Sequence, residues 1–454
     1  MKGKTTLILL GIFVVLFALI YFFDVKGGEK RSAREKQTKQ LFQVSKEEII
    51  QAEFITGERN VCDKSSGSWE ITTPVRTAGD TATIEYNLGQ IVEANIERTI
   101  ADSVEDLTAY GLAMPRGVVR LMSKDSTIAT LLIGDENPTG TLIFVKRADE
   151  AAVYTTAKTL WSNVSKSLFD LRDKQTMHIR TADVRRLELN SVKKGKVVLE
   201  KSGDNWQILQ PVPIATNSNE VTSLLNRLAN GRVKNFIAEE PTNLARYGFN
   251  RPRLTMNLFI GESLAKTSFV VGDTARNDGG GFYAREETRK PVFTLENWAV
   301  DNLTKGAFDL QNKKLTGFDG RSADRVVWRL DNREYAALKI DTTNWLIVAP
   351  DTVQVDETLF QRWLEALGDF SVDELEAYQP KPLASYGLDL PRLRVTIFKG
   401  DTQLGTILVG KQIKEDYYVK AGSAPYVYRI RKYTYERIAK KPDDLRRKMP
   451  EKAK

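Results

Sequence analysis

Alternating apolar and polar residues open three similar stretches of the chain and predict half-buried strands. In the middle stretch, Leu187 and Leu189 fall on one face, while Arg186 and Glu188 fall on the other. A second strand-like run at 195–202 and a third run follow, joined by short polar turns. The pattern therefore predicts an antiparallel meander.

The pattern then changes from a strand period to a helical period. Residues 217–231 place Val221, Leu224, Leu225 and Leu228 on one stripe, which predicts an amphipathic helix. Two further stretches carry matching stripes: Ile84, Leu88, Ile91 and Val92 in residues 80–94, and Leu359, Trp363, Leu364 and Leu367 in residues 356–368.

The same order of elements occurs three times, because independent sequence markers recur roughly 138 positions apart. Glycine permits a left-handed backbone that ends a helical approach, and proline fixes an extended start for the next strand. We therefore interpret the markers as structural. They are Trp69, Trp206, Trp345, Tyr110, Tyr247, Tyr386, Gly111, Gly248, Gly387, Pro115, Pro252 and Pro391, together with the strand-ending Gly134, Gly272 and Gly410.

A repeat of this length predicts a domain with its own core. The predicted fold class is α+β, with an N-terminal transmembrane helix followed by three tandem repeats of an antiparallel sheet with packed helices. The predicted boundaries are 1–25 for the anchor, 26–44 for a basic stalk, 45–178 for repeat module 1, 179–317 for repeat module 2 and 318–454 for repeat module 3.

The N-terminal run at residues 5–23 contains no charged side chain and predicts one membrane-spanning helix in the lipid bilayer. A cleaved signal peptide is the alternative, but the apolar run is long and no small-residue cleavage site follows it. More basic residues follow the run than precede it. Positive-inside counting would therefore place the modules in the cytoplasm.

Composition narrows the remaining classes of protein. The chain has 454 residues, is 41% hydrophobic and carries a formal net charge of +8. This modest basic excess, without a zinc-knuckle, RRM-type or helix-turn-helix pattern, does not predict a nucleic-acid partner. Cys62 and His178 are the single cysteine and histidine, so no intramolecular disulfide is possible and no metal site is expected.

No catalytic or cofactor-binding residue is predicted. His178 lies between two modules, and Cys62 is expected in a turn. Asp170 and Asp173 are better explained by an ion pair at a helix end than by an acid-base pair. The three glycines at 279–281 lack the ending of a phosphate loop, so a hairpin loop is expected there. The repeated tryptophans could stack on sugars, but we expect them in the cores.

Variable loops on a repeated scaffold are the expected place for partner binding. These loops follow the strand-ending glycines at corresponding corners of the modules, and their sequences differ. The candidate residues are Asp135, Glu136, Asn137, Asp273, Arg276, Asn277 and Lys411.

The order of motifs resembles the domain-of-unknown-function family numbered 4340 (DUF4340). The resemblance rests on the tryptophan strand, the YGL-x-x-P-R turn, the L-x-I-G-D strand end and the closing D-L-R-D-K, in three copies after the stalk. Module 2 lacks the closing Arg-Asp pair, and module 3 has Lys411 after its glycine.

The resemblance implies a bacterial protein with one N-terminal anchor that accompanies ABC-type transport systems of the gliding-motility auxiliary kind. It also implies that the modules lie outside the cytoplasm, against the positive-inside count. No substrate or active residue comes with it.

The leading hypothesis is a non-enzymatic, single-pass scaffold of the inner membrane, which binds a membrane protein complex such as an ABC-type transporter. The alternative is a protein that binds envelope polysaccharide or peptidoglycan. An enzyme is the third and least favoured hypothesis.

Overall fold

The computed structural model describes residues 39–64, 67–124, 126–422 and 424–447, together with Phe13, Phe17 and Tyr21. Apart from those three aromatic residues, the predicted anchor at residues 5–23 lies outside this described part. Within the described residues, no helix combines the length and the apolar character that crossing a membrane requires.

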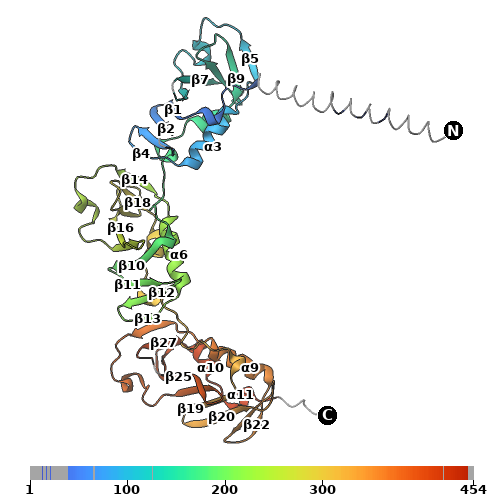
Figure 1. Cartoon of the computed structure of the whole chain (residues 1–454), viewed down its shortest axis with the longest axis vertical. Coiled ribbons are helices and arrows are strands. Elements are labelled where there is room, and N and C mark those ends of the chain that lie inside the picture. Colours follow the sequence, from blue (N-terminus) through green and yellow to red (C-terminus); the bar gives the residue numbers. More distant parts are fainter. Residues whose placement is uncertain are drawn as a thin grey trace, which may run out of the picture. The chain divides into compact units, whose positions relative to one another are not determined.

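The described strands form three nine-stranded sheets with one common order, which confirms the α+β class and the threefold repeat (Figure 1). In module 1 the strands follow one another across the sheet as β4 (Thr77–Ala78), β3 (Glu70–Thr73), β2 (Glu58–Asp63), β1 (Gln51–Thr56), β6 (Gly117–Met122), β7 (Thr127–Glu136), β8 (Leu142–Arg147), β9 (Val153–Ala157) and β5 (Arg98–Ala101). Neighbouring strands of this sheet are antiparallel.

Modules 2 and 3 repeat this order. The sheet of module 2 consists of β13 (Ile214–Ala215), β12 (Asn205–Gln210), β11 (Gly195–Ser202), β10 (Val184–Ser191), β15 (Leu254–Ile260), β16 (Ala265–Thr274), β17 (Phe282–Glu286), β18 (Val292–Leu295) and β14 (Asn235–Ala238). The sheet of module 3 consists of β22 (Val353–Gln354), β21 (Trp345–Ala349), β20 (Arg333–Lys339), β19 (Arg325–Leu330), β24 (Leu393–Lys399), β25 (Thr402–Ile413), β26 (Asp416–Ala421), β27 (Val427–Arg431) and β23 (Glu374–Ala377).

The helices also recur in order, with one long helix in each module. Module 1 contains η2 (Lys46–Glu48), α3 (Thr81–Val92), η3 (Thr108–Tyr110), α4 (Thr159–Val164) and α5 (Leu168–Leu171). Module 2 contains η4 (Thr181–Asp183), α6 (Ser218–Ala229), η5 (Leu244–Tyr247), α7 (Asn297–Leu303) and α8 (Ala307–Leu310). Module 3 contains η6 (Gly320–Ser322), α9 (Glu357–Gly368), η7 (Leu383–Tyr386), α10 (Lys432–Ile438) and α11 (Pro442–Leu445).

The predicted apolar stripes of α3 and α6 are buried, as expected for helices that cover a sheet. Helix α9 differs from the prediction, because Leu359 is 39% exposed and Phe360 is fully buried. Phe360, Trp363, Leu364 and Leu367 recur at one-turn intervals, and Leu359 lies beside that stripe. The sequence offered two adjacent apolar residues, and the larger aromatic one occupies the core.

The three marker tryptophans are core residues, as predicted, since Trp69, Trp206 and Trp345 are only 2%, 5% and 4% exposed. Hydrogen bonds also join two of these tryptophans to the helix that follows their strand. The backbone N–H of Trp206 donates to the hydroxyl of Ser218 (2.9 Å), and Trp69 Nε1 donates to Glu85 (2.7 Å). None of them presents a ring to solvent as a sugar platform would require.

The core of module 1 includes residues that sequence patterns placed elsewhere. Leu41 and Phe42 are 0% and 3% exposed, although they precede the predicted start of the module. Cys62 lies in strand β2 opposite Ala52, which corrects the expectation of a turn. The strand was missed because residues 58–63 are mostly polar. Burial raises the pKa of the Cys62 thiol to about 12.

Contacts divide the chain into two compact units. The first comprises residues 1–175, 232–240 and 291–293, and the second comprises residues 176–231, 241–290 and 294–454. Strand β14 of module 2 therefore belongs to the unit that contains module 1, and module 3 shares its unit with most of module 2.

The single thiol should report the unfolding of module 1. Because Cys62 is buried and its pKa is raised, we expect no reaction with a maleimide at neutral pH in the native chain. Reaction should begin when urea unfolds module 1. Mass spectrometry of the labelled chain measures this. Rapid labelling without denaturant would contradict the burial of this strand.

The carboxylate of Glu85 should make module 1 sensitive to acid. Burial raises its pKa, but hydrogen bonds from Lys64, Trp69 and Lys46 outweigh burial and lower the pKa to about 2. A lowered pKa contributes stability above the unfolded value of about 4.3, and this is lost as the pH falls toward 2. Urea unfolding followed by circular dichroism measures the free energy of unfolding. Over this pH window, that free energy should fall less in Glu85→Gln than in the natural chain. Equal losses in both chains would exclude Glu85 as the cause.

Candidate functional site

Each module contains the tyrosine-glycine turn at the same place in the fold. In module 1, η3 ends at Tyr110 and the next residue, Gly111, has a φ of +66°. Gly248 and Gly387 have φ values of +79° and +64°. Side chains are strained in this left-handed region, so the turn requires glycine. The left-handed glycine predicted for the turn is present in all three modules.

The turn packs directly against the glycine near the end of the following long strand. A Cβ atom on Gly134 would lie 2.1 Å from the carbonyl oxygen of Tyr110, well inside van der Waals contact. The same approach occurs at 2.0 Å for Gly272 with Tyr247 and at 2.1 Å for Gly410 with Tyr386. The tyrosine turn and the strand-ending glycine recur together because their backbones are in contact, which leaves no room for a side chain on that glycine.

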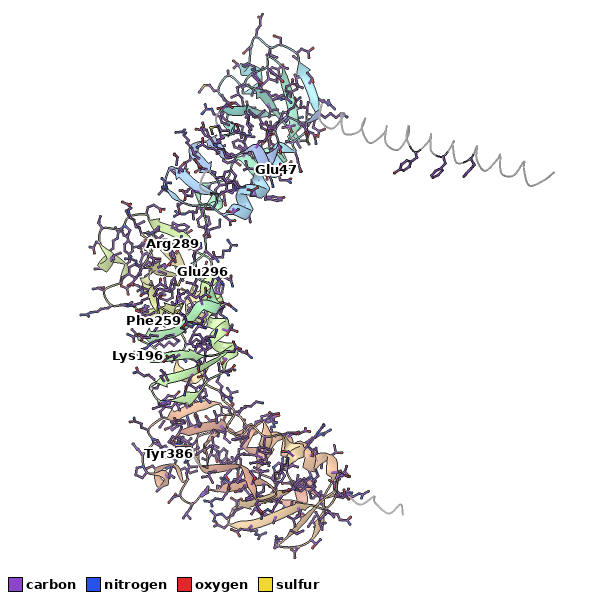
Figure 2. All side chains as sticks on the ribbon, in the orientation of Figure 1. Glu47, Lys196, Phe259, Arg289, Glu296 and Tyr386 are labelled. Atoms are coloured by element: carbon purple, nitrogen blue, oxygen red, sulfur yellow. The ribbon has the colours of Figure 1, made fainter. Side chains whose placement is uncertain are left out.

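The tyrosine rings anchor the turn to the strand on the far side of the hairpin. Tyr110 meets Phe144 edge to face, with ring centroids 5.0 Å apart. The equivalent pairs in modules 2 and 3 are both 5.1 Å apart and are Tyr247 with Tyr283 and Tyr386 with Tyr418 (Figure 2 labels Tyr386). Turn, strand end and next strand therefore form one packed unit.

The arginine after the marker proline also stacks on an aromatic ring. The Arg116 guanidinium lies 4.1 Å from the centre of the Trp161 ring, at the start of the strand that follows Pro115. In modules 2 and 3 the pairs are Arg253 with Phe282 and Arg392 with Tyr417. This contact fixes the side of the turn opposite to the tyrosine.

A comparison with known protein families identifies the repeated unit. The DUF4340 family, a domain of unknown function, matches residues 69–215, 206–343 and 345–452. The chain belongs to the DUF4340 family. No curated protein and no solved structure matches the chain significantly. The three matched segments begin at the marker tryptophans Trp69, Trp206 and Trp345.

In each DUF4340 module the turn and the hairpin loop form a contiguous surface, which we call the module tip. The tips comprise residues 110–116 with 134–141, residues 247–253 with 272–281, and residues 386–392 with 410–415. All seven predicted partner-binding residues lie on these tips. A Cβ atom on Gly111 would lie 2.5 Å from the carboxyl carbon of Asp135, so the loop begins directly over the turn.

The loop of the module 1 tip is held by its own side chains. The side-chain oxygen of Asn137 accepts hydrogen bonds from the backbone N–H groups of Thr141 and Leu142, both at 3.0 Å. Glu136 accepts a hydrogen bond from Lys158 at 2.7 Å, and this bond lowers the pKa of Glu136. The loop therefore has a preformed conformation, in which Glu136 is paired with Lys158 and Arg116 while Asp135 is exposed.

The loop of the module 2 tip contains the three glycines and is a hairpin connection between β16 and β17, as predicted. The backbone N–H of Ala275 donates to the carbonyl of Gly281, and the N–H of Gly280 donates to the carbonyl of Ala275, both at 2.9 Å. The Tyr283 hydroxyl donates to Asp278. Burial and this hydrogen bond raise the pKa of Tyr283 to about 12. Arg276 and Asn277 are exposed.

The loop of the module 3 tip is shorter and presents basic residues. Its strands pair up to Ile413 and Asp416, and Lys414 adopts a left-handed backbone with φ of +54°. Lys411 is exposed and takes the place that Asp135 has in module 1. A Cβ atom on Gly387 would meet the backbone nitrogen of Lys411 at 3.0 Å. The contact is mainly with backbone, so a change from aspartate to lysine is tolerated.

Sequence reasoning missed the most exposed apolar residues of the tips. Met114 is 89% exposed and Leu390 is 78% exposed, each directly before the marker proline. Module 2 has the exposed Arg251 at this position. Their position inside a conspicuous motif was the available signal, because the two residues between Leu or Phe and Pro differ in every copy.

Two other groups were considered from the sequence as possible chemical sites. Asp170 accepts hydrogen bonds from the backbone N–H and hydroxyl of Ser167, at 3.0 and 2.7 Å, so it takes part in capping α5. His178 is exposed. Within the described residues, no group of three or more His, Cys, Asp or Glu side chains could hold a metal ion.

The backbone contact at the tip should be sensitive to one methyl group. Gly134→Ala places a Cβ atom on the Tyr110 carbonyl and should lower the free energy of unfolding of module 1 by about 1–3 kcal/mol. Gly89→Ala is the matched control, because the nearest atom to its Cβ is 3.9 Å away and it lies in α3. It should instead raise stability by about 0.5–1 kcal/mol. Urea unfolding followed through Cys62 labelling measures both. Equal shifts would mean that the contact is not tight.

Proposed function

We propose that this chain is a non-enzymatic scaffold, anchored in the inner membrane by residues 5–23, that binds a membrane protein complex through its module tips. The partner proposed is an ABC-type transport complex, and the modules are proposed to lie outside the cytoplasm. This sidedness follows the family resemblance, whereas the count of basic residues around the anchor points the other way.

The tips carry this proposal. Each combines a backbone fixed by the glycine contact with side chains that differ between modules. Met114 and Leu390 are strongly exposed apolar side chains in the turns of the tips of modules 1 and 3. An apolar anchor surrounded by polar groups on a rigid support is the arrangement that dominates protein–protein recognition.

The charges of the tips favour one partner with several distinct contact sites. The tip of module 1 carries Asp135, and Glu136 is paired there with Arg116 and Lys158, whereas the loop of module 3 carries Lys411 and Lys414 beside Glu415. These mixed and different charge patterns would favour a partner of complementary pattern over a uniform polyanion. Anchoring would add to this by raising the local concentration of all tips near a membrane partner.

A glycan-binding function is the second candidate, and one observation favours it. Trp298 is 68% exposed and Tyr433 is 70% exposed, and both are the second residue of equivalent helices, α7 and α10. Exposed aromatic rings can stack on sugars. Module 1 has Thr159 in the corresponding part of α4, so the repeat is incomplete.

Replacing the apolar anchors should release the partner. In the full chain, Met114→Ser with Leu390→Ser removes the two apolar contacts and should abolish co-purification of transporter subunits from native membranes in mild detergent. Mass spectrometry of the purified material, quantified against the natural chain, measures the loss. Replacing the loops at 135–141 and 273–281 should have the same effect.

Val192→Ser is the matched control, because Val192 is 83% exposed and lies outside the tips. It should leave co-purification unchanged. Undiminished transporter subunits in the tip variant would contradict the proposal. Binding to cell-wall material that is lost on Trp298→Ala with Tyr433→Ala, but not in the tip variant, would support the glycan-binding function instead.

A further inference from the structure

The sheet of module 3 has an inner face that packs on the core and an outer face that points away from it. On β19, Val326 and Trp328 are core residues, so Val327 between them lies on the outer face. Over the second half of the outer face, Tyr386 of the turn packs with Leu408 of β25. Among the described residues, the first half is left open, since Val327 is 36% exposed (Figure 1 labels β19 and β20).

The outward residues of β19, β20 and β21 form a contiguous apolar patch. Val327 lies opposite Ala336, and Leu338 lies opposite Leu346. Residues that lie opposite one another on antiparallel strands project from the same face of the sheet. Leu338 and Val348 are both 37% exposed. We call these five side chains the open face of module 3.

The corresponding positions in the other two modules are polar. Strand register gives the equivalents of Val327, Leu338 and Leu346 as Glu53, Asp63 and Glu70 in module 1, and as Glu188, Glu200 and Gln207 in module 2. Because the same sheet forms with polar side chains at all three positions, the fold does not require apolar residues there. An exposed apolar patch that the fold does not require is typical of an interaction surface.

Loss of the carboxylates also changes the charge of this face. In module 2, Arg186 forms an ion pair with Glu188 at 2.6 Å. In module 3, Arg325 takes the place of Arg186 and Val327 takes the place of Glu188. The Arg325 guanidinium instead lies over the Phe398 ring, 4.1 Å from its centre. Its charge is therefore available beside the open face.

Two further arginines border the open face. Arg329 of β19 lies opposite Arg394 of β24. Within the described part of the chain, no carboxylate forms a salt bridge with Arg325, Arg329 or Arg394. Glu334, opposite Arg329, is the one acidic side chain among the outward residues of the described strands β19, β20 and β21. The border of the open face is therefore basic.

These charges separate the possible occupants. Two open faces from two copies of the chain would bring arginines against arginines, which like-charge repulsion opposes. An anionic bilayer would match the charge. However, Val327, Leu338 and Val348 are only 36–37% exposed on a flat sheet, so they offer little side chain to insert into lipid. A protein with an apolar stripe bordered by carboxylates matches both the centre and the border.

The dimensions of the open face favour a helix as that protein element. Strands lie about 4.8 Å apart and a helix is about 10 Å wide, so three strands give a surface as wide as one helix. The opposite face of the same sheet already packs on helix α9. Arginine suits the border, because its planar guanidinium can hold a carboxylate with two hydrogen bonds.

We propose that the open face of module 3 is a docking surface for an acidic amphipathic helix of a partner protein. Apolar residues of that helix cover Val327 and Leu338, and its flanking carboxylates pair with Arg325, Arg329 and Arg394. The open face shares no residue with the module 3 tip at 386–392 and 410–415. The inference therefore goes beyond the function proposed for the tips and does not rest on it.

A dye on the open face can report what covers it. Val348→Cys can carry an environment-sensitive dye, because the natural thiol of Cys62 is buried and should stay unlabelled. The probe is a synthetic amphipathic helix with a leucine stripe flanked by glutamates, added to the labelled full chain in nanodiscs of zwitterionic lipid. We expect a saturable blue shift of the dye. A peptide with lysines in place of the glutamates should bind at least about tenfold more weakly.

Two double variants of the labelled chain test where the peptide binds. Val327→Glu with Leu338→Glu gives the open face the residues of module 2 and should abolish the shift. Module 3 should stay folded, because Arg325 then gains a carboxylate partner, and urea unfolding followed by circular dichroism checks this. Val192→Glu with Leu264→Glu is the matched control, since these residues are 83% and 47% exposed in turns of module 2. It should bind the acidic peptide as the natural sequence does.

Several outcomes would overturn the proposal. No shift with the acidic peptide, equal shifts with both peptides, or a shift that persists in the Val327→Glu, Leu338→Glu variant would each exclude the open face as a site for an acidic helix. A shift in nanodiscs of anionic lipid without peptide would assign the face to lipid headgroups instead. A shift that grows with the concentration of the chain alone would assign it to a second copy.

Discussion

The contact between the tyrosine carbonyl and the strand-ending glycine is the constraint on which each module tip depends. It needs two glycines, one with a left-handed backbone in the turn and one without a side chain in the strand. Because backbone atoms carry the contact, neighbouring side chains can change while the geometry is kept. Lys411 in place of an aspartate is the clearest case: the residue type and its charge differ, but its place over Gly387 is the same. Variation in the loops therefore does not disturb the scaffold.

The boundaries between modules differ from the tips. Their backbone geometry is similar, but the side chains that meet there are chemically different. Main-chain hydrogen bonds hold the segments by which the chain leaves modules 1 and 2. The N–H of Asp173 donates to the carbonyl of Ala78, and the N–H of Asn312 donates to the carbonyl of Ala215. Yet Arg172 is paired with a carboxylate and Gln311 with a phenol. Arg172 is buried, whereas the side chain of its partner Glu239 is 34% exposed. Desolvation of Arg172 opposes the Coulomb attraction of the pair, so removing Glu239 alone would leave a buried charge without its counterion.

The periodicity of the sequence was enough to predict the repeat, the strand meander, the long helix and the core role of the tryptophans. Each of these depends on residues close together in the chain. The order of strands could not be predicted, because the pairing of β1 with β6 and of β5 with β9 joins segments far apart in sequence. Local patterns also failed where two adjacent residues were both apolar, as with Leu359 and Phe360. They failed again where a strand with buried residues consists mostly of polar residue types, as around Cys62. The exposure of Met114 could not be read from its hydrophobicity, because a turn residue can point inward or outward.

The edge strands of the sheets influence whether separate copies of the chain can pair with one another. An exposed strand edge is a template for pairing with another chain, and short edge strands reduce this hazard. One edge of every sheet is a two-residue strand, β4, β13 or β22, which offers few hydrogen-bonding groups. The other edge strand, β5, β14 or β23, has four residues. Strand β14 is half-buried throughout, whereas β5 has exposed polar and charged side chains in Arg98 and Thr99. Short edge strands therefore limit pairing between copies of the chain through the backbone.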